Sequence, residues 1–257
     1  MVAVTGASRG IGAAVAKAVA ARGSRVGLIA RSAGDLEAVL AGIGANGVAV
    51  TADVADRSAV VDAIAEVEAA LGPVNVLVVN AGIGAYGPLV DTSYEEMERL
   101  VQVNVLGTMY AIRAVLPGMV ERRRGHVVTI GSIAGRIGSP FEAVYSATKF
   151  AGVGLTEAFA VEVKPYGVGV SIVNPGVVAT EFGNARGHPY DRDSPKPISA
   201  ESVADAVVAA IEKGVAESYV PRWFRPAVLT RHLVPPLFRW GTTRSFRSEL
   251  RADEAQR

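Results

Sequence analysis

The stretch Val2-Ala3-Val4-Thr5-Gly6-Ala7-Ser8-Arg9-Gly10-Ile11-Gly12 decides the fold of this chain. A short apolar run suited to a buried strand leads into a glycine-rich turn, and an Ala-rich helical pattern follows from Ile11 to Arg22. Glycines let the backbone turn tightly and approach a pyrophosphate, which the free amides at a helix N-terminus then bind. Placed between a first strand and a first helix, this turn predicts a dinucleotide site. The residues expected to contact the dinucleotide are Gly6, Ser8, Arg9, Gly10, Ile11 and Gly12.

The rest of the chain alternates short apolar runs with longer periodic segments. This alternation predicts an α/β fold: a Rossmann-like doubly wound parallel sheet of about seven strands, with helices on both faces. We expect residues 1–220 to form one domain and residues 221–257 to form a basic, aromatic C-terminal extension. The expected strands are Val2–Val4, Arg25–Ala30, Gly47–Thr51, Val74–Asn80, Gly125–Ile130, Val168–Asn174 and Ser218–Val220. The expected helices are Ile11–Arg22, Arg57–Ala70, Glu95–Met119, Ala143–Val163 and Ala200–Lys213.

Composition excludes several classes of site. The chain has 257 residues, half of them hydrophobic, which suits buried parallel strands. It has no cysteine, which excludes disulfides and Cys-ligated metals. Its three histidines lie far apart without ligand spacing, so we expect no bound metal.

Charge is unevenly spread along the chain. Residues 1–217 carry 18 basic and 22 acidic groups, whereas residues 218–257 carry 8 and 3. The body therefore lacks the basic footprint of a nucleic-acid-binding protein. No basic region followed by a long apolar run opens the sequence, and we expect a cytoplasmic protein. The uncharged stretch Leu71–Val90 contains asparagines, prolines and glycines, which favours a buried strand and loop over a membrane span.

The end of the second strand indicates the cofactor. An acid at this position binds the 2′-hydroxyl of NAD, whereas an arginine accommodates the 2′-phosphate of NADP. Here Arg31 ends the strand and Arg9 lies in the glycine-rich turn, and two guanidiniums can clamp a phosphate. We therefore expect NADP(H). Two alternatives stay open: solvated arginines at loop ends, and NAD bound through Asp35, four residues past the strand end.

Ser132, Tyr145 and Lys149 form the candidate catalytic group. Tyr145 and Lys149 are four residues apart in a predicted helix and so share one face. A tyrosine normally titrates near pH 10, and lowering its pKa by about three units requires about 4 kcal/mol. One ammonium at about 4 Å supplies roughly that much at an effective dielectric of about 20, so Lys149 alone is expected to tune Tyr145. The alternative is a surface tyrosine beside a solvated lysine.

Several motifs in this order resemble those of the single-domain short-chain dehydrogenase/reductase family. The resemblance covers roughly residues 2–215. The matching elements are Thr5-Gly6-x-x-x-Gly10-x-Gly12, Asp53-Val54, Asn80-Ala81-Gly82, Asn104, Ser132, Tyr145-x-x-x-Lys149 and Pro175-Gly176-x-Val178-x-Thr180.

The resemblance implies a role for each element. Ser132 would bind the substrate oxygen, Tyr145 would donate or remove its proton, and Asn104 would hold a water that relays protons to Lys149. Lys149 would also bind the nicotinamide ribose. The other implied cofactor contacts are Asp53 and Val54 to the adenine, Asn80, Ala81 and Gly82 beside the cofactor, and Pro175, Gly176, Val178 and Thr180 at the nicotinamide.

The chain departs from the family pattern after residue 215. Many family reductases finish with a Thr-Gly…Asp-Gly-Gly segment that closes the fold and the tetramer interface, and this segment is absent here. The continuation looks more like that of family members acting on lipophilic alcohols and ketones. A homo-oligomer is still expected, either a dimer or a tetramer.

Residues 221–247 combine six arginines with aromatic and leucine side chains and contain no acid. Such a segment suits peripheral contact with a membrane. The alternative is that this segment forms an arm that covers the substrate cleft or packs on a second subunit. Membrane contact and such an arm are compatible with each other. Pro235-Pro236 should interrupt any long helix here.

The predicted cleft has an apolar border. Arg136 and Glu142 are expected to face solvent, and Glu181–Pro197 is expected to be a mobile loop that acts as a lid. The lining predicts a lipophilic small-molecule carbonyl or alcohol as substrate. The border residues are Ile133, Ala134, Ile137, Phe141, Val177 and Phe182.

Two other functions remain as alternatives. One is a 3-ketoacyl-carrier-protein reductase, for which Arg122-Arg123-Arg124 would attract an acidic carrier. The other is a non-catalytic NADP-sensing module, although such a module should lack the tyrosine or the lysine.

Overall fold

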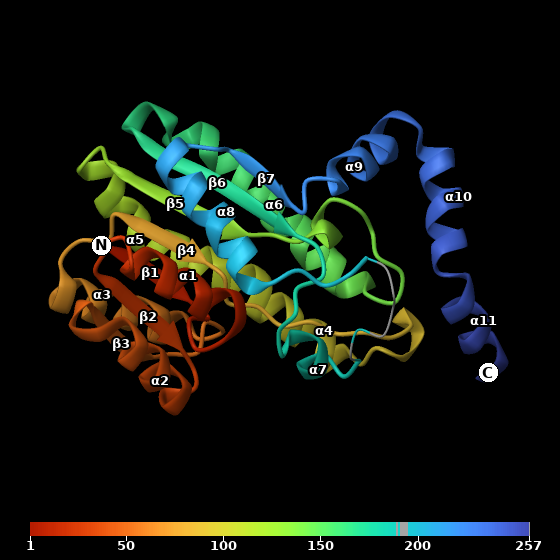
Figure 1. Cartoon of the computed structure of the whole chain (residues 1–257), viewed down its shortest axis with the longest axis horizontal. Helices are drawn as coiled ribbons and strands as arrows, with labels where there is room; N and C mark the ends of the chain where they lie inside the picture. Colours follow the sequence, from red (N-terminus) through yellow and green to blue (C-terminus); the bar gives the residue numbers. More distant parts are fainter. Residues whose placement is uncertain (189, 191–194, 257) are drawn as a thin grey trace.

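In the computed structural model, which describes residues 1–188, 190 and 195–256, seven parallel strands form one sheet (Figure 1). The strand order is β3-β2-β1-β4-β5-β6-β7, and every pairing is parallel. The doubly wound α/β fold expected from the sequence is confirmed. The strands are β1 (Val2–Thr5), β2 (Val26–Ala30), β3 (Gly47–Thr51), β4 (Val76–Val79), β5 (Gly125–Ile130), β6 (Val168–Pro175) and β7 (Glu217–Val220).

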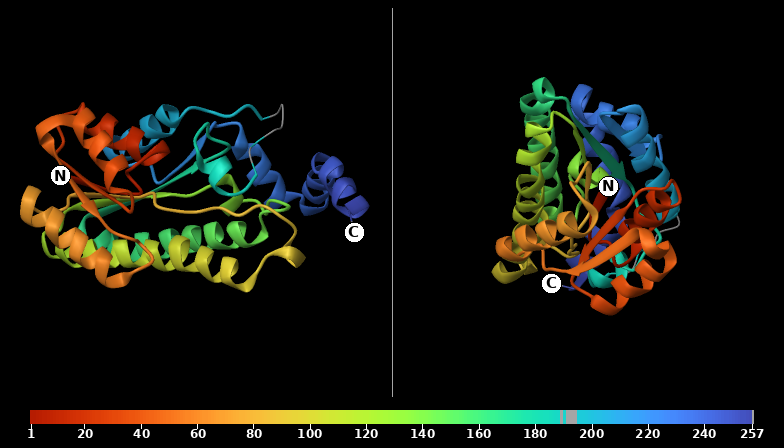
Figure 2. Two further views of the ribbon diagram at one scale, coloured as in Figure 1. Left: turned by 90° about the horizontal axis from the view of Figure 1, so that it is seen from below. Right: turned by 90° about the vertical axis from the view of Figure 1, so that its left-hand side faces the viewer.

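Helices cover both faces of the sheet (Figure 2). On one face lie α1 (Gly10–Ala20), α2 (Ala33–Ile43) and α8 (Ala200–Lys213). On the other lie α3 (Arg57–Leu71), α5 (Gly107–Glu121) and α6 (Ala143–Val163). The sequence prediction missed α2, because only Leu36 and Val39 of this helix are buried and its apolar stripe is therefore short.

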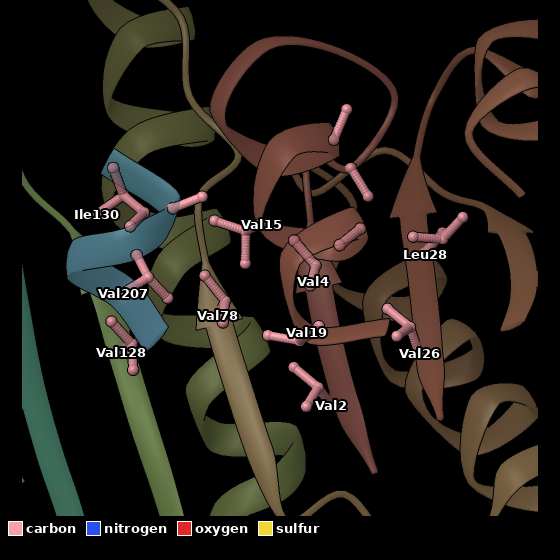
Figure 3. Close-up of a cluster of buried hydrophobic side chains, with 14 of the residues drawn as sticks. Val2, Val4, Val15, Val19, Val26, Leu28, Val78, Val128, Ile130 and Val207 are labelled. Atoms are coloured by element: carbon pink, nitrogen blue, oxygen red, sulfur yellow. The ribbon is translucent and has the colours of Figure 1, made fainter. Parts of the chain in front are cut away.

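The buried strands alternate their side chains between two separate cores. Val2 and Val4 of β1 meet α1 and α8 on one face, whereas Ala3 between them meets the core on the other face. Figure 3 shows the first core, with Val15 and Val19 of α1 and Val207 of α8 above the strands. Because both faces are covered, the strands read as continuous apolar runs, which is why the sequence revealed them.

The single long helix expected at Glu95–Met119 is divided in the structure. An α-helix, α4 (Tyr94–Val101), continues through a π-helical segment (Gln102–Leu106) into α5. Within the described residues, the run Tyr94–Glu121 is the one helix long and apolar enough to cross a membrane by length and composition. Its α5 part is a core helix that packs against α3 and the sheet.

Three helices follow β7: α9 (Phe224–Leu233), α10 (Pro235–Ser245) and α11 (Arg247–Gln256). The break before Pro235 lies where the proline pair predicts it. Helix α9 buries Phe224 and Val228 against the body, whereas α10 has no buried side chain and stands apart from the sheet (Figure 1). The remaining short elements are α7 (Phe182–Ala185) and 3₁₀ helices at Gly44–Asn46, Leu89–Asp91, Ile133–Gly135 and Lys164–Tyr166.

Candidate active site

The candidate site lies where the strand order reverses, beside β1 and β4. In open parallel sheets, ligands bind at such a switch point, outside the carboxyl ends of the strands. The predicted residues follow the carboxyl ends of strands, or lie on helices α1 and α6, or lie on the π-helical segment that packs against α6. The fold therefore gathers residues that are up to 174 positions apart, from Gly6 to Thr180, at one edge of the sheet.

The glycine-rich turn fits a dinucleotide pyrophosphate. Gly6 and Gly10 have φ of +64° and +54°, which side chains rarely tolerate. A Cβ at Gly12 would lie 2.1 Å from the carbonyl oxygen of Gly6, so only glycine permits this close turn. Helix α1 has no side-chain cap at Arg9 and no acid in its first turn, which leaves its N-terminal amides for an anion.

Asn80 fastens this turn to β4. Its Nδ2 donates to the carbonyl oxygens of Thr5 and Gly6 at 3.1 and 3.0 Å. The backbone amides of Asn80 and Ala81 donate in turn to Thr5 Oγ1. Thr180 also lies against the turn: a Cβ on Gly10 would lie 3.2 Å from Thr180 Cγ2. Residues of the motifs at 80–82 and 175–180 thus lie against the glycine-rich turn.

The two arginines of the expected phosphate clamp each have an acidic partner. Arg9 Nη2 lies 3.3 Å from Asp35 Oδ2, and Arg31 Nη1 lies 3.8 Å from Asp53 Oδ2. All four side chains are about half exposed. Such exposed pairs are worth about 0–1 kcal/mol, so a phosphate can displace them. Asp53 also accepts a turn hydrogen bond from Ala55 N at 2.9 Å, and neighbouring Val54 is buried.

Tyr145 is buried on α6, at 8% exposure, next to Ser132 and Lys149. It shares a hydrogen bond with the Ser132 side chain. Ser132 follows β5 and also accepts from Ala134 N at 3.1 Å. Lys149 Nζ lies 5.8 Å from the centroid of the Tyr145 ring and donates to the carbonyl oxygen of Ile130 at 3.1 Å. The structure therefore brings the three predicted catalytic residues together.

The pKa of Tyr145 contradicts the expectation that Lys149 alone lowers it. Burial raises this pKa, and the charge of Glu142 raises it further. The Ser132 hydrogen bond and the charge of Arg186 oppose these effects without cancelling them. The attraction of one ammonium leaves out the cost of removing water from the phenolate, which is the larger effect on the pKa of Tyr145. Burial also lowers the pKa of Lys149, to about 8.

Asn104 lies in the π-helical segment and is buried. Its Nδ2 donates to Ile83 O and to Thr148 Oγ1, at 2.9 and 3.0 Å, and its Oδ1 accepts from Ile83 N at 2.8 Å. The side chain thus braces the Gly82–Ile83 loop against the helix that carries Lys149. A Cβ at Gly82 would lie 3.2 Å from Asn104 Oδ1 and 3.7 Å from Lys149 Nζ, so glycine keeps space beside the lysine.

The expected lid covers Tyr145 in this conformation. The ring of Phe182 lies 5.8 Å from that of Tyr145, and both belong to a small apolar cluster with Leu100 and Ala134. Within the expected mobile loop, Phe182–Ala185 forms helix α7, whereas residues 189 and 191–194 lie outside the described residues.

The expectation that Arg136 and Glu142 face solvent is wrong. Both side chains are only 14% exposed, because each is held in an ion pair. Glu142 pairs with Arg186, and Arg136 pairs with Glu157 and Glu217. These partners are 21 to 81 residues away in sequence, so no local pattern could reveal them. Sequence reasoning missed Arg186 and Glu217 for the same reason.

Two surface hollows formed by described residues lie away from Tyr145. One lies between α8 and β7 and is lined in part by Ala206, Tyr219 and Arg222. The other lies along α4, beside Met97 and Val101. Neither is lined by a candidate catalytic residue.

Comparison with known proteins agrees with this geometry. Residues 1–191 match the model of the short chain dehydrogenase family. An inactive 2-(S)-hydroxypropyl-CoM dehydrogenase 2 from Xanthobacter autotrophicus is 45% identical over 66% of this chain and 74% of its own length. Dehydrogenase/reductase SDR family member 7B from Bos taurus is 35% identical over 93% of this chain and 78% of its own. A 3-oxoacyl-[acyl-carrier-protein] reductase from Bos taurus is 40% identical over 70% of this chain and 76% of its own length.

Solved structures share the fold and hold nicotinamide dinucleotides. An alcohol dehydrogenase from Thermococcus sibiricus, in complex with 5-hydroxy-NADP, superposes with a TM-score of 0.76 at 31% identity, covering 85% of this chain and 94% of its own. A short chain dehydrogenase/reductase from Burkholderia phymatum, in complex with NAD, superposes with a TM-score of 0.84 at 28% identity, covering 92% of this chain and 94% of its own. The chain therefore belongs to the short chain dehydrogenase family, a family of oxidoreductases.

Proposed function

We propose that this protein is an NADPH-dependent reductase of lipophilic carbonyl compounds in which Tyr145 is the general acid. The observation that carries the proposal is the buried Tyr145–Ser132 hydrogen bond beside Lys149, at the switch point that also carries the glycine-rich turn. The tyrosine and lysine that a non-catalytic sensing module should lack are both in place.

NADPH, when bound, would supply a hydride to the carbonyl carbon. The amides of the Gly6–Gly12 turn would hold its pyrophosphate, and Arg9 and Arg31 would hold its 2′-phosphate. Both arginines are exposed and weakly paired, which supports an NADP(H) preference. The remaining proposed contacts are Asp53 and Val54 to the adenine, Asn80, Ala81 and Gly82 beside the cofactor, Lys149 to the nicotinamide ribose, and Pro175, Gly176, Val178 and Thr180 to the nicotinamide.

The proton chemistry follows from the burial of the site. Ser132 would donate a hydrogen bond to the substrate oxygen and hold it beside the phenol. A raised pKa keeps Tyr145 protonated at neutral pH, as a general acid must be before it donates its proton to that oxygen. Lys149, with a pKa near 8, would then return a proton to the phenolate, through water beside Asn104.

The surroundings of Tyr145 favour an apolar substrate. Phe182, Leu100 and Ala134 pack next to the phenol, and the Glu142–Arg186 pair carries no net charge. Burying apolar surface stabilises a ligand by about 25 cal/mol per Å². Because Phe182 covers the phenol, the segment that carries α7 would move to admit substrate, as the predicted lid requires.

Reduction of a carrier-bound 3-oxoacyl group is the second candidate. Relatives named 3-oxoacyl-[acyl-carrier-protein] reductase, from Bos taurus and Escherichia coli, are 40% and 35% identical to this chain over 70% and 71% of its length. These matches favour the candidate, and the exposed triplet Arg122-Arg123-Arg124 would face the acidic carrier. Replacing the triplet by alanines should lower turnover of a carrier-bound substrate but spare a free ketone.

We propose a cytoplasmic homo-oligomer, a dimer or a tetramer, with peripheral membrane contact through residues 221–247. Leu233, Leu237 and Trp240 are 76, 53 and 62% exposed, and arginines accompany them. Basic residues with exposed apolar side chains suit the interface of an anionic bilayer. Sedimentation with and without anionic vesicles tests both the oligomer and the membrane contact.

A substrate screen tests the proposed function. Oxidation of NADPH and of NADH is followed with ketones and aldehydes graded by chain length and polarity, and with a carrier-bound 3-oxoacyl substrate. We expect bulky or long apolar carbonyls, with NADPH, to give the highest kcat/KM. A clear preference for short polar carbonyls would contradict the apolar lining as a substrate site.

A further inference from the structure

We infer that helix α9 is part of the active site: it holds the Ser132 turn and the Pro175–Thr180 loop in place, with Arg136 and Arg231 as positioning residues. This inference rests on the proposed function, because it takes Ser132 as the group that binds the substrate oxygen. Helix α9 lies beyond residue 191, where the match to the family model ends.

The Ser132 turn packs directly on the catalytic helix. A Cβ at Gly135 would lie 2.8 Å from the carbonyl oxygen of Lys149 and 3.0 Å from its Cβ. Glycine therefore allows the turn to approach the backbone of α6 more closely than any other residue would. A displacement of this turn would change the position of Ser132 relative to Tyr145.

Arg136 fixes this turn from its C-terminal side. Its Nη1 lies 2.7 Å from Glu157 on α6, and its Nη2 lies 2.6 Å from Glu217 on β7. Glu217 also accepts a hydrogen bond from Asn174 Nδ2 at 2.9 Å, directly before the Pro175–Thr180 loop. The planar guanidinium thus joins the Ser132 turn to α6, to β7 and to the start of the loop.

This arrangement of charged side chains does not give the highest free energy of unfolding. Arg136 Nε and Asn174 Oδ1 are buried without a hydrogen-bond partner among the described residues. Burying charged and unpaired polar groups costs free energy that an apolar core would not. A positioning role accounts for keeping the charged side chains here.

Arg231 links α9 to the same turn. Its Nη1 donates to the carbonyl oxygen of Arg136 at 2.7 Å. Its guanidinium also lies 4.7 Å from the centroid of the Phe150 ring, next in sequence to Lys149. One side chain of the extension therefore contacts both the Ser132 turn and the helix of the catalytic tyrosine and lysine.

Phe224, at the other end of α9, supports the second loop. A Cβ at Gly176 would lie 2.2 Å from the Phe224 ring, so the ring packs on the bare backbone of Gly176. Phe224 is 8% exposed. Helix α9 thus contacts both loops that flank the reacting atoms, at points that lie seven residues apart on the helix.

Substitution of Arg231 tests the inference. Arg231→Ala, Arg231→Lys and the control Arg251→Ala, which changes an exposed arginine of α11, are compared with the wild type. Steady-state kinetics give kcat and KM with the best carbonyl substrate, and fluorescence titration gives the NADPH Kd. Hydrogen–deuterium exchange of the peptide 131–137 reports the order of the Ser132 turn without requiring turnover.

We expect Arg231→Ala to lower kcat by about tenfold or more, because a displacement of about 1 Å near reacting groups can lower the rate by up to about a hundredfold. The NADPH Kd should stay within about twofold, because a fall in kcat with cofactor binding intact marks a loss of stabilisation specific to the transition state, here through the position of Ser132. Amides of 131–137 should exchange faster. Arg231→Lys keeps a donor and should recover most of the rate, and Arg251→Ala should match the wild type.

Equal kcat and equal exchange in Arg231→Ala and the wild type would overturn the inference, as would a lower melting temperature with kcat unchanged. If Arg231→Ala does not fold, Glu217→Gln, which weakens the Arg136 contact from β7, is measured in the same way. A wild type that binds NADPH but reduces none of the carbonyls refutes the proposed function instead. The exchange data then still decide whether α9 orders the turn.

Discussion

Tyr145 is the residue on which the proposed chemistry depends, and substitution by phenylalanine removes its hydroxyl group while keeping the aromatic ring. Tyr145→Phe should lower kcat by more than about a hundredfold, the usual contribution of a general acid, while leaving the NADPH Kd unchanged. Lys149→Ala should lower kcat and also weaken NADPH binding, since the lysine is proposed to contact the nicotinamide ribose. Tyr166→Phe, at a partly exposed tyrosine, is the control. Retention of more than about a hundredth of the activity in Tyr145→Phe would refute the assignment.

Lys149 should determine how the reaction depends on pH. Burial lowers its pKa to about 8, so its ammonium is present below this pH and is lost above it. Reduction uses the ammonium to reprotonate Tyr145. We therefore expect kcat for reduction to be flat at neutral pH and to fall about tenfold per unit well above pH 8. Lys149→Arg keeps its proton and should lack this decline, whatever its absolute rate. A decline that persists in Lys149→Arg would have to come from another group.

Arg31 should determine which dinucleotide is preferred. Arg31→Asp removes a cation from the proposed 2′-phosphate site and places a carboxylate at the end of β2, which favours the 2′-hydroxyl of NAD. Charge-assisted contacts to phosphate are worth about 1.5–3 kcal/mol, so the ratio of kcat/KM for NADPH to that for NADH should fall by tenfold or more. Arg22→Asp makes the same charge change at a distant exposed arginine and should leave the ratio unaltered. A wild type that already prefers NADH would contradict this assignment.

Among the elements, the turn between β1 and α1 depends most strictly on sequence. Gly12→Ala would place a methyl group 2.1 Å from the Gly6 carbonyl oxygen and 2.6 Å from Asn80 Nδ2. The turn must then open, so we expect at least about tenfold weaker NADPH binding and a lower melting temperature, the usual result of overpacking.

A glycine on α6 provides the contrast. Gly154 is exposed within the helix, and a Cβ there has no neighbour within 4 Å among the described residues. Gly154→Ala should therefore raise the free energy of unfolding by about 0.5–1 kcal/mol through helix propensity, with NADPH binding unchanged. Chemical denaturation monitored by circular dichroism measures both variants. Equal effects of the two substitutions would show that the close contact at Gly12 has no special importance.

At the scale of the whole molecule, the extension divides into two parts. Helix α9 contacts the two active-site loops, whereas α10 and α11 stand apart from the sheet (Figure 1) and the ring of Phe246, between them, lies 6.4 Å from the Phe141 ring. A chain ending at residue 234 should keep kcat and the NADPH Kd but lose binding to anionic vesicles. The full chain should bind those vesicles less at high salt, because its arginines are screened. If the shortened chain binds vesicles as the full chain does, an arm on a second subunit becomes the better explanation of α10 and α11.

Local sequence determined the elements and the order of the site. Covered strands read as short apolar runs, and the glycine-rich turn, Ser132 and the i, i+4 pair Tyr145 and Lys149 can be recognised from spacing within one element. The helices α2, α9, α10 and α11 went unrecognised, because α2 buries few residues and the extension mixes charge with apolar side chains.

Tertiary structure decided the electrostatics and the partners. Burial raised the pKa of Tyr145, which spacing alone had led us to expect lowered by Lys149. Arg136 and Glu142, expected in solvent, are held in ion pairs and are each only 14% exposed. Arg231 donates to a carbonyl group 95 residues away. The physical reason is that a periodic pattern specifies which face of an element is buried, whereas desolvation and pairing depend on distances of a few ångströms that exist only once the elements have packed.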